Sequence, residues 1–274
     1  MKRIATFTAG LAACLVTAAA SAGVYVELVN HDIPGNTTEL SQKMYVEGGN
    51  GRFVDQEGHA TIIKGNTMYI VDDSDQTYIA FDKATMAQLS KQIAAAMARM
   101  KDQLAKMPPE QRAQIEAMMA KTPGMGGEDQ KWVVDVVDTG KSEKVDGRNC
   151  RVWDVKRNGE LDDQLCVVPF SQLPGKENFQ AVFANFAKVF EEMAKSVPTL
   201  SGVMNNEFSA QAKVGGFPVR SRAYENGKLG DQEELVKTWR EQAIPAAMFE
   251  IPAGYKPKQM PAPGAAPEIQ PGFQ

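Results

Sequence analysis

Two cysteines, Cys150 and Cys166, are the side chains with the clearest chemistry in this sequence, and that chemistry is oxidation to a disulfide. They flank a segment typical of a β-hairpin, with one strand on each side of Arg157-Asn158-Gly159. A three-residue loop with glycine in the left-handed conformation is a common hairpin connection. Counting outward from that loop places the cysteines opposite each other, so we expect a bond between them. Two free thiols are the alternative. A zinc site is disfavoured because a nearby His and a second acidic ligand set are missing.

Methionines are concentrated between residues 83 and 127, and their thioether groups suggest a binding role. Flexible methionine surfaces adapt to varied apolar partners and lipid chains. Thioether sulfur also ligates Cu(I), but no His or Cys joins this cluster, so we expect no metal and no other cofactor. Plain packing of two amphipathic helices against a sheet explains the same spacing. The groove candidates in this segment are Met97, Met100, Leu104, Met118 and Met119.

The remaining polar residues do not predict catalysis. Both histidines, His31 and His59, lie in or beside turns, with no Ser or Cys placed beside them as a nucleophile. The run Asp72-Asp73-Ser74-Asp75 resembles the start of a calcium loop but lacks the glycine at its sixth position and the distal glutamate. A solvated hairpin turn is the simpler interpretation. We therefore expect a protein that is not an enzyme.

The first 22 residues predict export. A positive start is followed by the apolar run Ile4 to Ala20, and Ala20-Ser21-Ala22 supplies a small-x-small cleavage pattern. We expect a signal peptide over residues 1–22, cleavage before Gly23 and a periplasmic mature protein. A minor alternative is lipidation at Cys14, because Leu11-Ala12-Ala13-Cys14 fits the lipoprotein consensus.

Composition narrows the class further. The chain has 274 residues, 43% hydrophobic residues and a formal net charge of −4. The apolar fraction is sufficient for a sizeable core. A mildly acidic chain with no basic block argues against nucleic acid as a partner. No second apolar run is long enough for a membrane span.

The elements that must position these groups fall into alternating blocks of strands and helices. Close spacing and Gly-rich turns predict an antiparallel meander before residue 82. Later strands are expected over 131–138, 150–168, 216–224 and 228–239. The strands of the first block are expected at Val24–Val29, Glu39–Val46, Gly51–Asp55, His59–Lys64, Thr67–Val71 and Thr77–Phe81.

Helical periodicity appears twice. Apolar residues spaced three or four apart from Met86 to Met107 predict a first helix, which Pro108-Pro109 ends before a second helix begins. A third helix is expected over 176–195, with an aromatic seam that either lines a groove or fills it. The members of that seam are Phe179, Phe183, Phe186 and Phe190.

Together these elements predict an α+β fold, a curved antiparallel sheet with helices packed on its concave face. We expect one domain over residues 23–255 with a helical insert at 83–127. Five prolines among residues 256–274 predict a disordered tail.

Several short motifs resemble a bacterial envelope family of unknown function that neighbours the LolA/LolB-like lipoprotein carriers. They are the closing segment Ile244-Pro245-Ala246-Ala247-Met248-Phe249-Glu250-Ile251-Pro252, Gly147-Arg148-Asn149-Cys150, and Thr67-Met68-Tyr69-Ile70-Val71. The resemblance implies a half-barrel wrapped around helices, an apolar cavity, periplasmic export and no catalytic residues. The Met-rich insert departs from the short carriers.

Two functions are compatible with these observations. The first is a non-enzymatic periplasmic protein that binds an acyl chain or a lipidated partner in a groove between sheet and helices. The second is a protein-interaction or envelope-stress module that has the same fold and no small ligand, with the Pro-rich tail and the insert as contact sites.

Overall fold

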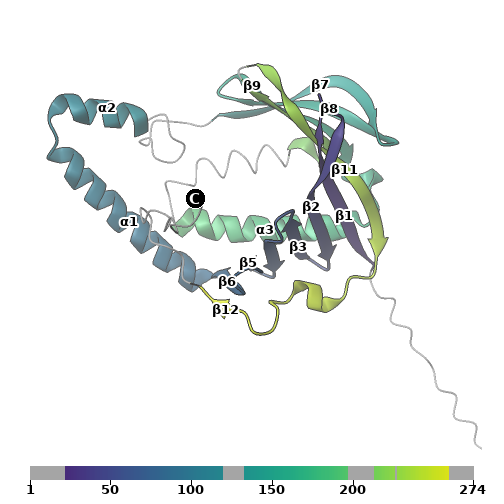
Figure 1. Cartoon of the computed structure of the whole chain (residues 1–274), viewed down its shortest axis with the longest axis horizontal. Helices are drawn as coiled ribbons and strands as arrows, with labels where there is room; N and C mark the ends of the chain where they lie inside the picture. The colour runs from purple at the N-terminus through teal and green to yellow at the C-terminus, as the bar shows by residue number, and fades with distance from the viewer. Residues whose placement is uncertain (1–21, 120–132, 197–212, 226, 259–274) are drawn as a thin grey trace, which may run out of the picture.

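The computed structural model describes residues 22–119, 133–196, 213–225 and 227–258, and within these ranges the chain forms a single twelve-stranded sheet (Figure 1). The strand order is β12-β6-β5-β4-β3-β2-β1-β11-β10-β9-β8-β7, so that the first and last long strands, β1 and β11, are neighbours at its centre. The bounds are β1 Gly23–Asp32, β2 Thr37–Glu47, β3 Asn50–Asp55, β4 Ala60–Lys64, β5 Thr67–Asp72, β6 Thr77–Phe81, β7 Val134–Val145, β8 Arg148–Arg157, β9 Glu160–Pro169, β10 Gly216–Glu225, β11 Lys228–Gln242 and β12 Lys256–Pro257. The predicted α+β class is confirmed, with an open, curved sheet that is antiparallel except at β12.

Sheet curvature has a local cause in β-bulges, which bend and twist the strands that carry them. The pairing of β1 shifts register twice near Leu28, because β11 carries the extra residue Lys237 and β2 carries the extra residue Ser41. Strand β10 carries an extra residue between Pro218 and Arg220. A further shift lies in β7 between Asp138 and Ser142, where Gly140 has a φ of +74°. Figure 1 shows β7, β8 and β9 at the top, folded over from the central strands β1 and β2.

Helices enter between strands at two places. Helices α1 (Lys83–Ala105) and α2 (Pro109–Met119) follow β6, and α3 (Lys176–Ser196) lies between β9 and β10. Figure 1 shows α3 lying along the sheet, whereas α1 runs away from the β6 edge and carries α2 with it. Helix α3 contacts β2 to β5, and α1 contacts α3 and β6. Of the predicted helices, only α3 therefore packs along the sheet over its length.

The main core is formed by the face of the sheet that α3 covers. Its fully buried members include Val24, Val26, Val46, Phe179 and Val219. A smaller cluster on β4 and β5, formed by Ala60, Ile62 and Val71, packs against Tyr255 of the C-terminal segment. The two clusters together give β4 and β5 apolar contacts on both faces.

The Cys150–Cys166 disulfide is confirmed, with a Cα–Cα separation of 5.3 Å, but its expected register is wrong. The turn contains two residues, Asn158 and Gly159, both with positive φ, and Arg157 pairs with Glu160. β9 then carries one extra residue, Asp162, so that the residue opposite Cys166 is Val152. The bond therefore runs diagonally between the strands.

The C-terminal boundary also differs from expectation. Lys256 and Pro257, assigned to the tail by composition, form β12 beside β6. The Lys256 amide donates to the Gln76 carbonyl at 3.0 Å, and the Lys258 amide donates to the Tyr78 carbonyl at 2.7 Å. Residues 259–274, the remainder of the predicted tail, and residues 1–21, with the predicted leader and Cys14, lie outside the described ranges. No helix within the described ranges is long and apolar enough to cross a membrane.

Candidate functional site

The aromatic seam of α3 is divided between core and surface. Phe179 is only 1% exposed and stacks on Trp239 with ring centroids 4.7 Å apart. It also meets Phe217 edge-on at 5.5 Å, so this ring fills the space between α3 and the sheet. The other three rings, Phe183, Phe186 and Phe190, are half-buried further along α3.

The apolar stripe of α1 starts in the core and continues outward along the helix. Met86 is buried, whereas Leu89, Met100 and Leu104 are half-buried. Among the described residues, Met100 and Leu104 lie on α1, whereas Phe179 lies in the core between α3 and the sheet. The side chains of Met97, Met118 and Met119 lie outside the described part of the chain.

A groove of about 410 Å³ lies between α1 and the β6–β12 edge. This volume is within the range of roughly 300–1,000 Å³ typical of small-molecule sites. Helix α1 is fixed at this edge by its N-cap, because the Asp82 carboxylate accepts from the Thr85 amide at 2.8 Å. The groove is lined by Tyr78, Ala80, Asp82, Thr85, Gln88, Leu89, Gln92, Pro257 and Lys258.

One polar atom in the groove wall has an unmet hydrogen bond. The side-chain oxygen of Gln92 is buried and has no partner among the described residues. Buried polar atoms are nearly always paired in folded proteins, so each exception indicates a missing partner. The Gln92 side chain also lines the groove. The wall therefore combines apolar side chains with one buried acceptor.

A second polar feature crosses the sheet far from the groove. Glu233 on β11 is 9% exposed and lies directly opposite both His31 on β1 and Arg222 on β10. His31 donates through Nδ1 to Glu233 at 3.0 Å and through Nε2 to Asn36 at 3.1 Å. Arg222 donates through Nε to Glu233 at 2.7 Å. This arrangement places the His31 imidazole and the Arg222 guanidinium on one buried carboxylate, with the Arg220 guanidinium 3.9 Å from it.

These contacts shift the pKa values of both titrating groups. The hydrogen bonds to Asn36 and Glu233 raise the pKa of His31 above its ordinary value, since both ring nitrogens then favour carrying a proton. Burial by itself raises the pKa of Glu233, but the hydrogen bonds from Arg222 and His31 outweigh burial and the net pKa is lowered. The network therefore consists of oppositely charged side chains that link β1, β10 and β11.

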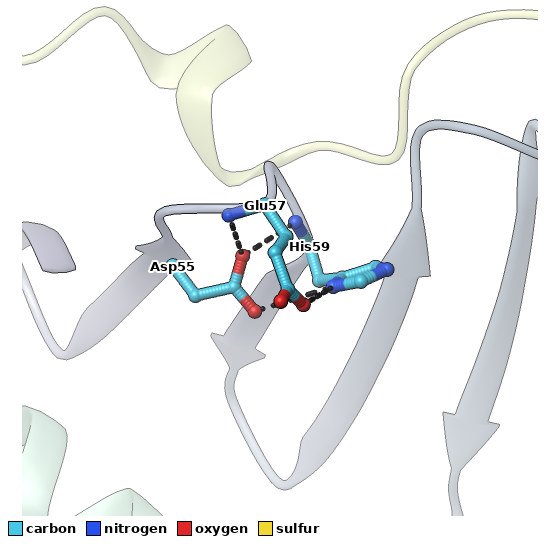
Figure 2. Close-up of side chains that lie close together, drawn as sticks. All are labelled: Asp55, Glu57 and His59. Atoms are coloured by element: carbon cyan, nitrogen blue, oxygen red, sulfur yellow. Dashed lines mark hydrogen bonds and ion pairs between the residues drawn. The ribbon is translucent and has the colours of Figure 1, made fainter. Parts of the chain in front are cut away.

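Asp55, Glu57 and His59 form a small cluster at the β3–β4 turn (Figure 2). One ligand atom from each lies within 4.8 Å of the others, which is compatible with a divalent cation held by two carboxylates and an imidazole. The Asp55 side chain also accepts from the Glu57 and His59 amides at 3.0 and 2.9 Å. His59 Nδ1 is 3.3 Å from Asp55 and 3.4 Å from Glu57, so the imidazole contacts both carboxylates directly. We interpret the cluster as a stabilised turn.

The groove wall and the clusters around Glu233 and His59 were not predicted from the sequence. The spacing of Asp55, Glu57 and His59 at alternate positions around a Gly-containing turn could have indicated their cluster. Glu233 lies about 200 positions away from His31 along the chain, and only the β1–β11 pairing brings the two together. The burial of Gln92 could not be predicted from the sequence, because it depends on the position of α1 against β6.

Comparisons with known proteins give a family and little more. Residues 83–255 match the family described as Domain of unknown function (DUF4412). No curated protein matches the chain. The solved crystal structure of an uncharacterized conserved protein from Thermus thermophilus aligns over 87% of this chain and 90% of that chain, with 8% identity and a TM-score of 0.41.

Proposed function

The chain belongs to the DUF4412 family, and we propose that it is a non-enzymatic periplasmic protein that binds an acyl-chain ligand in the groove beside α1. The observation that supports this proposal is the groove wall. Leu89, Tyr78 and Pro257 offer apolar surface, and the buried Gln92 oxygen requires a donor. An acyl chain with a hydroxyl-bearing or amide-bearing head group meets both requirements.

The periplasmic part of the proposal depends on other observations. The Cys150–Cys166 disulfide suits an oxidising compartment. Strand β1 begins at Gly23, the residue directly after the expected cleavage site, and it is paired from that first residue with Gln242. Removing residues 1–22 therefore leaves the strand complete.

The finer form of the proposal is a carrier similar to the LolA/LolB-like proteins. An open, curved sheet with a helix along one face is compatible with such a carrier. The position of the ligand differs from the sequence-based expectation, because Phe179 occupies the space between α3 and the sheet. In our proposal the ligand lies outside that core, against α1, and Met100 and Leu104 extend the apolar surface beyond the groove.

Fluorescent acyl probes test the proposal on the purified mature protein. We expect saturable binding of a fluorescent monoacylglycerol that is lost in Leu89→Asp, since a carboxylate in the apolar wall is costly to desolvate. Leu229→Asp is the matched control, because Leu229 is 41% exposed on β11 and does not line the groove. Gln92→Leu should raise the dissociation constant for the monoacylglycerol roughly tenfold, which corresponds to the loss of one hydrogen bond. Absence of saturable binding to the wild-type protein would overturn the proposal.

A further inference from the structure

Helix α1 is positively charged, whereas the chain as a whole has a negative net charge. Together with its C-cap residue Lys106, α1 contains five basic residues and a single acidic residue, Asp102, within a chain of formal charge −4. The basic residues are Lys83, Lys91, Arg99, Lys101 and Lys106. The rest of the chain is correspondingly more acidic, so the positive charge is concentrated on one element.

These cations are all exposed, and within the described ranges none of the five forms an ion pair. Cations elsewhere in the described sheet are often paired with a carboxylate. For example, Arg151 lies 2.8 Å from Asp138, and Arg222 lies 2.7 Å from Glu233. The charge of α1 is therefore available to a partner outside the chain.

The cations also occupy a defined side of the helix. At 3.6 residues per turn, the eighteen-residue separation of Lys83 and Lys101 places both at the same angle around the axis. Lys91, Arg99 and Lys106 follow on the same half of the helix, opposite the stripe that contains Met86, Met100 and Leu104. The stripe is buried or half-buried, whereas the basic half faces solvent. Figure 1 shows that α1 runs away from the β6 edge of the sheet.

We propose that α1 docks on an anionic lipid bilayer surface, with its basic half against the lipid phosphates. Charge complementarity supports this partner, because a 23-residue helix extends about 34 Å and presents its cations along that length. A linear array of separated cations matches a plane of repeated phosphates. The acidic remainder of the chain is repelled by the same surface and orients the protein with α1 toward it.

Docking of α1 on a bilayer would also determine where the groove lies relative to the lipid. The groove is lined by the first three turns of the same helix, through Thr85, Leu89 and Gln92. A protein held to a bilayer by α1 therefore places this groove beside the lipid head groups. The two properties remain separable, since the docking residues do not line the groove.

Vesicle co-sedimentation tests the proposal with the purified mature protein. We expect binding to vesicles that contain phosphatidylglycerol and none to pure phosphatidylcholine vesicles. Binding should be strong at about 0.01 M salt and lost near 1 M, where the Debye length falls from about 30 Å to 3 Å. The triple variant K91Q/R99Q/K101Q keeps helix propensity. It should lower the partition coefficient roughly a hundredfold, from the average contribution of a basic residue at an anionic surface.

A matched triple variant controls for total charge. K141Q/K144Q/K228Q removes three exposed cations from β7 and β11 and should bind phosphatidylglycerol like the wild type. Equal losses in the two triple variants, or no binding by the wild type, would overturn the proposal, and the second result would favour an acidic protein partner. Leu89→Asp separates the two functions, because it should abolish acyl-probe binding and leave vesicle binding intact.

Discussion

Replacing Phe179 with alanine tests the packing that joins α3 to the sheet. The ring is 1% exposed, so alanine loses nearly the whole transfer free energy of a phenyl group. It also loses the stack on Trp239 at 4.7 Å and the edge contact with Phe217 at 5.5 Å. Phe→Ala changes in cores cost about 3–5 kcal/mol. The walls belong to a helix and a sheet that cannot easily collapse, so we expect a value near about 4 kcal/mol.

Urea denaturation of the disulfide-intact protein measures this loss as a change in the free energy of unfolding. Phe179→Leu keeps most of the volume and should cost less than about 1.5 kcal/mol. Leu229→Ala, at a position 41% exposed, should change stability by less than about 0.5 kcal/mol. A loss below about 1 kcal/mol in Phe179→Ala would mean that the ring is not enclosed between α3 and the sheet.

Three further predictions concern the Cys150–Cys166 disulfide, the ion network around Glu233 and the N-cap of α1. Reducing the Cys150–Cys166 bond releases a loop of sequence separation 16 and should lower the free energy of unfolding by about 3 kcal/mol, read from urea curves with and without reductant. The pKa of folded His31 is raised, so its contribution to stability is complete below the ordinary His pKa and is lost as pH rises through the folded value. The stability difference between wild type and His31→Gln should therefore shrink with rising pH; a difference that grows would contradict the ion pair with Glu233. Asp82→Ala removes the α1 N-cap and should cost about 1 kcal/mol, seen as faster amide exchange in the first turn of α1, with unchanged exchange counting against the cap.

Local chemistry made the order of the elements predictable. The turns at Asn66 and at Asn158-Gly159 separate strands whose apolar residues alternate with a period close to two. All six strands predicted before α1 are present. The Met86 to Met107 spacing and Pro108-Pro109 located α1 and α2 in the same way. These signals lie within a few residues of the structure that they specify.

Features that depend on distant pairing were not predictable from these signals. The extra residue Asp162 displaced the register around the disulfide, and this bulge carries no glycine that could mark it in the sequence. Strand β12 depends on hydrogen bonds to Gln76 and Tyr78, about 180 residues earlier in the chain. The groove beside α1 results from that same pairing, so its lining residues could not be predicted from the periodicity of the helix alone.

Native mass spectrometry of the mature protein purified from the cell envelope tests whether an acyl chain binds beside α1. We expect a wild-type species carrying one acyl lipid per chain, a bare species for Leu89→Asp, and a lipid-loaded species for Leu229→Asp. A bare mass for the wild-type protein, or a lipid retained equally by both variants, would contradict binding in the groove between α1, β6 and β12.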